Sequence, residues 1–353
     1  MQTKVFPIML CREGFILDQD VSAKNGALLA TSGSRLSASL IIKLKEMGIQ
    51  SVQIKGDFSE AELEALKISE VEAQTKLYIE EYKEDLEGFH EIMDEISSGE
   101  DLKIEKINKM IDGFIQKDQT NFSILKCINE MKNFDEYTYT HSINVSIYAM
   151  LLAKCEKLSN KQIEHVMQAG ILHDIGKAKI PNEILNKPAP LNDEEFEIMK
   201  THSTLSYRII QDIPAIDDNV KRAVLMHHEK ENGHGYPLGA SGTNLHLYER
   251  ILAIADVYDA LTSSRVYKKG MTAFQAFRIF EQMGIGHFDY NMMKEFIYNV
   301  ACFYIGSKAL LSDGRECEIV FIPPTSISCP TIKIDSVYLD LNKFPLLEIV
   351  QIF

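Results

Sequence analysis

Apolar residues recur every three or four positions between residues 118 and 300, and this spacing predicts a series of amphipathic helices. The clearest segments are H-S-I-N-V-S-I-Y-A-M-L-L-A-K-C, K-Q-I-E-H-V-M-Q-A-G-I-L-H and Y-E-R-I-L-A-I-A-D-V-Y-D-A-L. Asn192 is followed three residues later by Glu195, which is a capping-box pattern at a helix start. Strand signals are few here, so the middle of the chain is predicted to be a helical bundle.

The two ends of the chain follow a different pattern. Residues 1–58 alternate short apolar runs with turn residues and contain one helical stretch, which predicts a small α+β module. Residues 301–353 carry further short apolar runs, and Asp313-Gly314 between two of them predicts a hairpin turn. The fold class expected is therefore mainly α, with a helical core, a small α+β N-terminal module and a small β-rich C-terminal extension.

Residues 59–117 form an acidic helical connector. They contain 17 acidic and 7 basic residues, and this net charge of −10 is most of the −14 carried by the whole chain. Apolar residues lie between the charges at roughly helical spacing, and Ser97-Ser98-Gly99 is expected to divide the segment into two helices. A solvated connector and a helix for dimerisation or signal coupling both fit this pattern. The predicted domains are 1–58, 59–117, 118–300 and 301–353.

Composition limits the class of protein. The chain has 353 residues, of which 45% are hydrophobic and 25% charged, as in an ordinary protein with a substantial core. The negative net charge argues against a binder of nucleic-acid polymers or anionic membranes. No apolar stretch reaches the roughly 18–20 residues that span a bilayer, and the start lacks a signal-peptide pattern. We expect a cytoplasmic protein whose six cysteines are reduced thiols.

Histidine and aspartate residues at seven positions have the chemistry of a metal site. Imidazole nitrogens and carboxylate oxygens suit divalent transition metals, and this set exceeds the needs of one ion. A buried carboxylate or imidazole in an apolar helix is costly without a partner. The candidate ligands are His141, His173, Asp174, His202, His227, His228 and Asp256.

Taken singly, these residues have simpler explanations. The His173-Asp174 pair alone is more often a hydrogen bond at a helix end. Without a metal, each of the seven residues needs a structural explanation of its own. One centre with two ions accounts for all seven residues, with Asp174 bridging the two ions. Paired ions displace groups at phosphorus, because a water held between them loses its proton near neutral pH. Lys177, four residues after His173, can place an ammonium group near a phosphate; otherwise it is a surface lysine.

A glycine-rich loop follows the second histidine pair. Gly233 and Gly235 allow a close backbone approach or a positive φ, and Pro237 stiffens the end of the loop. Tyr236 can offer a ring face or a hydroxyl group to a ligand. The alternative is a tight turn without a binding role.

The motifs H-D-I-G-K-x-x-I-P and H-H-E-x-x-x-G-x-G-Y-P, with A-D-V-Y-D-A-L-T-S-S-R-V-Y-K, resemble the HD-GYP family, a branch of the HD phosphohydrolases. The resemblance covers about residues 118–300. It implies a helical domain with two or three divalent metal ions, often iron or manganese. It also implies hydrolysis of the bacterial second messenger cyclic di-GMP to pGpG, and onward to GMP in some members.

The resemblance also assigns roles to individual residues. The seven candidates above match the metal ligands, and Asp174 and Lys177 match catalytic positions. Tyr236, Asp259, Arg265 and Lys268 match positions near the substrate, where an arginine can grip phosphate or guanine with two hydrogen bonds. Some members carry a glutamate that supports a third metal at the position of Tyr137, so two ions are expected here.

The function expected is a metal-dependent phosphodiesterase that cleaves cyclic di-GMP. Iron and manganese are the favoured ions, and zinc or nickel would also fit the ligand types. Two alternatives remain: an HD phosphohydrolase acting on another nucleotide, and a weakly active or inactive cyclic-dinucleotide sensor. Residues 1–117 are the expected contact with a second copy or a signalling protein.

Overall fold

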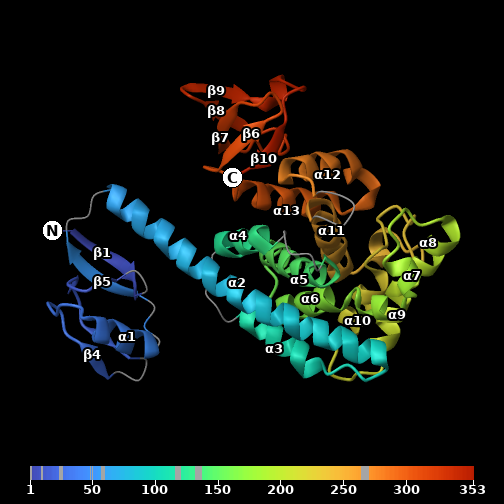
Figure 1. Ribbon diagram of the computed structural model, residues 1–353, viewed down its shortest axis with the longest axis horizontal. Coiled ribbons are helices and arrows are strands. Elements are labelled where there is room, and N and C mark those ends of the chain that lie inside the picture. The colour runs from blue at the N-terminus through green and yellow to red at the C-terminus, as the bar shows by residue number, and fades with distance from the viewer. Residues whose placement is uncertain are drawn as a thin grey trace. The chain divides into compact units, whose positions relative to one another are not determined.

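The computed structural model describes residues 2–8, 11–23, 27–47, 49, 51–56, 60–115, 121–131, 137–263 and 270–353. The chain divides into two compact units, residues 1–78 and 79–353. Mainly α architecture is confirmed, with small sheets near both ends (Figure 1).

The first unit is an α+β module. Strands β1 (Gln2–Pro7), β5 (Ser51–Gly56) and β2 (Ile16–Leu17) form an antiparallel sheet in the order β1-β5-β2. Strands β3 (Val21–Ser22) and β4 (Leu28–Ala30) pair separately, and one helix follows, α1 (Ala38–Glu46). Alternate residues of β5 are buried, and the core includes Leu17, Leu44 and Ile54. The small α+β N-terminal module predicted from the sequence is confirmed.

One helix runs through the boundary between the two units. Helix α2 (Glu60–Ser98) ends next to Gly99, whose positive φ of 95° favours glycine, and α3 (Ile104–Ile115) follows. Within the second unit, buried α2 residues recur at spacings of three and four, from Tyr82 through Phe89 to Ile96. The sequence placed a domain boundary at residue 58, and the four-part division stays a prediction.

The second unit is built around α5 (Tyr137–Cys155), whose residues 141–153 are all buried. It packs against α6 (Asn160–Leu172) and α11 (Leu247–Thr262). Gly170 permits the first contact, because a Cβ there would lie 2.5 Å from Ser146 Cα. The other helices are α4 (Asn121–Met131), η2 (Ile175–Lys179), α7 (Asn182–Leu185), α8 (Asp193–Lys200), α9 (His202–Ile210), α10 (Asp218–Met226), η3 (Gly242–Asn244), α12 (Ala273–His287) and α13 (Tyr290–Cys302).

Several local predictions hold in this unit. Asn192 and Glu195 form the expected capping box at the start of α8. The hairpin turn at Asp313-Gly314 joins β6 (Lys308–Leu311) to β7 (Glu316–Phe321), and Gly314 has a φ of 86°. With β8 (Thr331–Ile334), β9 (Val337–Asp340), η4 (Leu341–Lys343) and β10 (Ile349–Ile352), these strands give an antiparallel sheet in the order β10-β6-β7-β8-β9.

The C-terminal sheet is fixed to α12, beside which it lies in Figure 1. Glu281 of α12 accepts a hydrogen bond of 2.8 Å from the Ile327 backbone, and Thr272 Oγ1 donates one of 3.1 Å to the Ile349 carbonyl. All six cysteines are free, as expected. Among the described helices, none has both the length and the apolar character needed to cross a bilayer.

Candidate metal centre

Helix ends supply most of the candidate ligands. His173 caps the C-terminus of α6, His202 begins α9, and His227 caps the C-terminus of α10. His141 and Asp256 come instead from the interiors of α5 and α11. Helices that are separate in sequence thus direct their side chains to one buried place.

Three of these histidines are oriented in the same way. The Nδ1 atoms of His173, His202 and His227 each lie 2.7 Å from the carbonyl oxygen three residues earlier. A carbonyl only accepts hydrogen bonds, so each Nδ1 carries the proton and each Nε2 presents a lone pair in the neutral ring. Backbone carbonyls commonly hold metal-binding histidines in this way.

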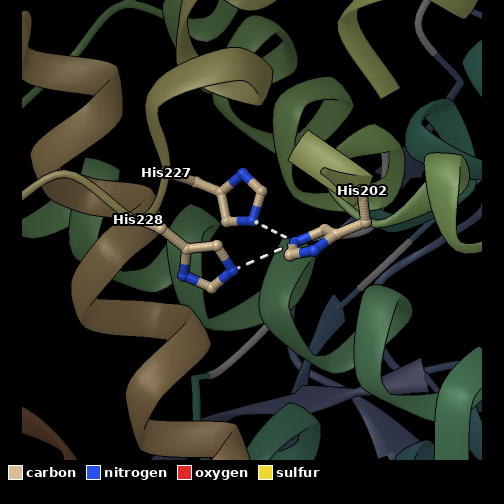
Figure 2. Close-up of side chains that lie close together, drawn as sticks. All are labelled: His202, His227 and His228. Carbon is tan, nitrogen blue, oxygen red and sulfur yellow. Dashed lines mark hydrogen bonds between the residues drawn. The ribbon is translucent and has the colours of Figure 1, made fainter. Parts of the chain in front are cut away.

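The ligand atoms gather in two groups. The first contains His202, His227 and His228, and Figure 2 shows their rings facing one another. His202 Nε2 lies 3.3 Å from His227 Nε2 and 3.1 Å from His228 Nε2. The second group contains His141, His173 and Asp174, and within each group the ligand atoms lie within 4.8 Å of one another.

Two carboxylates reach toward both groups. Asp174 Oδ1 lies 3.3 Å from His202 Nε2, whereas Asp174 Oδ2 lies 3.3 Å from His173 Nε2. Asp256 Oδ1 lies 3.1 Å from His141 Nε2, and Asp256 Oδ2 lies 3.7 Å from His228 Nδ1. Asp174 therefore offers one oxygen to each group, as a bridging ligand must, and Asp256 lies between His141 and His228.

This donor set fits a divalent metal. The Nε2 atoms of His202 and His227 both present lone pairs at 3.3 Å, which repel each other unless a cation or a proton lies nearby. Buried His173 Nε2 makes no hydrogen bond to any residue that the structure describes. Imidazole nitrogens with carboxylate oxygens are typical ligands of divalent transition metals, so the two groups can hold such ions.

The charges in this site are strongly coupled. Burial, followed by the proximity of other histidines, holds the pKa of His227 well below its ordinary value. Burial also lowers the pKa of His228, to about 3. Burial opposes protonation of His141 as well, but hydrogen bonds to Asp256 and Asp259 outweigh it and raise the pKa to about 9. The carboxylates thus attract positive charge at this point, as a proton or as a metal ion.

Asp174 and Asp256 stay ionised although both are buried. Burial raises the pKa of each carboxyl group, but His173 and Lys177 reverse this for Asp174, and His141 reverses it for Asp256. Both pKa values fall below the ordinary range. The two candidate ligands are therefore anionic at neutral pH.

The segment after His173 is held tightly against α9. Ser206 Oγ donates to the His173 carbonyl at 2.7 Å and accepts from the Gly176 backbone N–H at 2.8 Å. A Cβ at Gly176 would lie 2.3 Å from the His202 carbonyl oxygen. Glycine is therefore required where the two ligand-bearing segments cross.

The glycine-rich loop packs against the second histidine pair. Gly233 has a φ of 74°, and a Cβ at Gly235 would lie 2.5 Å from the His228 carbonyl oxygen. The Tyr236–Pro237 peptide bond is cis. The Tyr236 ring centre lies 4.6 Å from that of His228, and Lys200 Nζ lies 5.8 Å from the Tyr236 ring centre. Tyr236 therefore lies next to the candidate ligands.

A pocket of about 270 Å³ opens on the centre. Its polar lining residues are His141, Asp174, Lys177, His228 and Asp256, and its apolar wall comes from Val257, Ala260 and Leu261 of α11. Lys177 Nζ lies 2.5 Å from Asp174 Oδ2. The predicted catalytic pair therefore lies together in this pocket. Arg265 and Lys268, predicted to contact substrate, lie outside the described residues.

Asp259 differs in placement from what the sequence led us to expect. It is completely buried, and Asp259 Oδ2 accepts a hydrogen bond from His141 Nδ1 at 2.8 Å. Asp259 Oδ1 accepts from Asn144 Nδ2 at 3.0 Å and from Ser263 Oγ at 2.9 Å. This placement favours support of His141 over contact with substrate. Asn144 was missed, although its position three residues after His141 puts both on one helix face.

Comparison with known proteins supports an HD domain in the middle of the chain. A family model described as an HD domain matches residues 124–292, the region that contains every candidate ligand. This part of the chain matches the HD domain family. The HD domain implied by the H-D-I-G-K motif is confirmed by this match, and the names of curated relatives agree with the HD-GYP resemblance.

Several curated proteins similar to this chain are named as phosphodiesterases of cyclic dinucleotides. A cyclic di-GMP phosphodiesterase of Pseudomonas aeruginosa is 35% identical over 62% of this chain and 54% of the relative. A cyclic di-GMP phosphodiesterase of Thermotoga maritima is 35% identical over 48% of this chain and 47% of the relative. A 3′3′-cGAMP-specific phosphodiesterase of Vibrio cholerae is 34% identical over 41% of this chain and 32% of the relative. The chain thus spans about half, or less, of the length of these relatives.

A solved structure supports the fold. A Bdellovibrio bacteriovorus protein described as an HDG"Y"P protein matches 85% of this chain and 99% of its own, with a TM-score of 0.50 and 15% sequence identity. At this level of identity, the likeness concerns the fold alone.

Proposed function

We propose that this HD domain protein is a metal-dependent phosphodiesterase that hydrolyses cyclic di-GMP to pGpG. The observation that carries the proposal is the convergence of seven histidine and aspartate side chains on two adjacent groups joined by two carboxylates. The names of the relatives at 35% identity support cyclic di-GMP as the substrate.

Two divalent ions, iron or manganese by preference, would occupy the two groups. His202, His227 and His228 would hold one, His141 and His173 would hold the other, and Asp174 and Asp256 would reach both. Bound there, such ions would neutralise charge on a phosphodiester and lower the pKa of a water molecule. Neutral His227 and His228 and the two ionised carboxylates have the protonation states that this role requires, and a bound ion would replace the proton that the raised pKa of His141 otherwise favours.

The surrounding side chains would bind and orient the substrate. Lys177 supplies the cationic side chain among the described residues that line the pocket, and it can hold a non-bridging phosphate oxygen. Burial, then Asp256 and Asp174, raise the pKa of Tyr236, so its hydroxyl stays a hydrogen-bond donor. The apolar wall on α11 suits the face of a base and excludes water. Arg265 and Lys268 remain proposed contacts to phosphate or guanine.

A second substrate of the same class is 3′3′-cGAMP. Relatives named as 3′3′-cGAMP-specific phosphodiesterases are 33–34% identical to this chain, close to the values for those named for cyclic di-GMP. Both molecules present the same phosphodiester ring to a metal centre. A comparison of kcat/KM for the two substrates decides between them.

The test is turnover of cyclic di-GMP by anaerobically purified, metal-loaded protein. We expect linear pGpG from the wild type and none from His173→Ala or Asp174→Ala, with circular dichroism showing a retained fold. His165→Ala is the matched control, because His165 lies on α6 with His173 but faces Asp217 at 4.0 Å. Full activity in either ligand variant refutes the assignment. Binding without turnover in fully loaded wild-type protein would support a sensor instead.

A further inference from the structure

A chain of buried hydrogen bonds leads from the connector helix α2 to the candidate metal ligands. Tyr82 of α2 donates from its hydroxyl to Asn144 Oδ1 at 2.8 Å. Asn144 Nδ2 donates to Asp259 Oδ1 at 3.0 Å, and His141 Nδ1 lies 2.8 Å from Asp259 Oδ2. Four side chains from three helices thus connect residue 82 with a metal ligand.

The direction of each bond follows from the donors and acceptors available. Ionised Asp259 can only accept, so the Asn144 amide must turn its NH₂ group toward it. The Asn144 oxygen then faces Tyr82, which must donate. Because Asp259 also accepts from His141 Nδ1, His141 Nε2 is left as the atom directed toward Asp174 and Asp256. One arrangement of hydrogens satisfies the whole chain, and the Thr140 carbonyl, 3.2 Å from the Tyr82 hydroxyl, is a second and more distant acceptor of the same proton.

Water cannot easily replace any of these bonds. The exposed fractions are 0% for Tyr82, 1% for Asn144, 0% for Asp259 and 3% for His141. Burial, followed by the charge of Asp259, holds the pKa of Tyr82 well above its ordinary value, which keeps the hydroxyl proton in place. In a buried network, removal of one donor leaves its acceptor without a hydrogen bond, because no water molecule can take the place of the donor.

A second contact joins α2 to the segment that follows His173-Asp174. Lys179 Nζ donates to the Ile96 carbonyl in the last turns of α2, and Lys179 lies two residues after Lys177. Between these points, the Phe89 and His90 rings lie 6.4 Å and 4.6 Å from the Tyr139 ring, near the start of α5. Helix α2 therefore contacts the elements that carry His141 and those that follow His173-Asp174.

We propose that Tyr82 is a positioning residue for the metal centre, which orients His141 through Asn144 and Asp259 and thereby makes helix α2 part of the site. The inference rests on the proposed function only in that His141 is a metal ligand. Because α2 begins at Glu60, in the first compact unit, a shift of this helix along its axis would alter metal binding at the His141 side of the centre.

The experiment measures metal binding to Tyr82→Phe without substrate. Apo protein of full length is titrated anaerobically with Co²⁺, followed by calorimetry and by visible absorption, which reports the coordination of each ion. We expect two binding events in the wild type. In Tyr82→Phe one event should weaken by about 10-fold or more, as when a histidine ligand loses its supporting partner, while the other is unchanged.

Controls separate positioning from general stability. Tyr304→Phe is matched, because Tyr304 is also buried and its hydroxyl bonds to Asn129 at 3.3 Å, outside the chain that leads to His141. We expect its Co²⁺ titration to equal that of the wild type. Asn144→Leu should weaken the same binding event, and adding Tyr82→Phe to it should weaken the event no further, because the connection is already broken.

Wild-type Co²⁺ affinity at both positions in folded Tyr82→Phe overturns the proposal. Equal weakening in Tyr82→Phe and Tyr304→Phe also overturns it, because the effect would then be one of stability. The readout is independent of turnover. If the wild type hydrolyses no cyclic dinucleotide while Tyr82→Phe still weakens one Co²⁺ event, the proposed function fails and the positioning role stands.

Discussion

Gly176→Ala is expected to damage the metal centre through backbone geometry alone. The Cβ of alanine would lie 2.3 Å from the His202 carbonyl oxygen, 2.4 Å from the Ser206 backbone nitrogen and 2.8 Å from Ser206 Oγ. Two of these atoms belong to the backbone, so no side-chain rotation relieves the contact. The segment that carries His173-Asp174 must move away from α9.

The size of the effect follows from that displacement. Ordinary contact requires the backbone atoms to separate by about 1 Å more. Overpacking of this kind costs roughly 1–3 kcal/mol of unfolding free energy. The movement also separates His173 and Asp174 from His202, and a misplacement of about 1 Å typically reduces turnover by about 100-fold.

The assay combines urea unfolding with Mn²⁺ binding and turnover. Gly113→Ala is the control, because Gly113 lies within α3 and a Cβ there would meet no atom within 4 Å. Alanine favours the helix at that exposed position, so this variant should gain about 0.5–1 kcal/mol and keep wild-type metal affinity. Unfolding of Gly176→Ala at the wild-type urea concentration, together with normal Mn²⁺ binding, would refute the requirement for glycine where the two segments cross.

Three further outcomes follow from the site. The folded pKa of His228 is about 3, below the value of 6.5 in the unfolded chain, so the unfolded state binds the proton first. The contribution of His228 to the unfolding free energy of the metal-free protein is then fully present above pH 6.5, and it falls by up to ~1.4 kcal/mol per pH unit as the pH drops toward 3. His228→Gln should reduce this dependence of the unfolding free energy on pH, as measured by urea titrations at several pH values. Mn²⁺ at about 100 times its Kd should stabilise the fold by ~2.7 kcal/mol in calorimetry, an effect absent from Asp174→Ala. Arg265→Ala should raise the Kd for cyclic di-GMP more than that for Mn²⁺; equal losses would contradict a substrate contact.

The sequence predicted the ligand set because each member stands out against its neighbours. Asp256 interrupts an apolar helix, and His227 and His228 place two imidazoles side by side at the end of another helix. Such residues are costly inside a core unless something binds them, so their positions carry information without a structure. The helices themselves follow from apolar spacing, and the hairpin at Asp313-Gly314 follows from its turn residues.

The buried placement of Asp259 next to His141 could not be predicted from the sequence in the same way. Residues 256 and 259 are three apart on one helix, so the sequence correctly puts both on one face of α11. Which of them is open to the pocket depends on how α5 packs across that face. His141 of α5 lies between the two carboxylates, with Asp259 at Nδ1 and Asp256 at Nε2. Depth below the surface is a tertiary property that local spacing does not encode.

Electrostatics link the fold of this domain to the divalent ions that its two ligand groups could hold. Without a cation, burial and then the close imidazoles hold the pKa of His227 down, whereas Asp256 and Asp259 outweigh burial and hold the pKa of His141 up. Neighbouring groups in one buried site are thus driven toward opposite charge states, and each is stabilised only by the others. A divalent ion interacts favourably with both the lone pairs and the carboxylates, so it relieves both kinds of strain at once. Metal binding should therefore order the helix ends that carry the ligands, and loss of metal should loosen α6, α9 and α10 before the rest of the bundle.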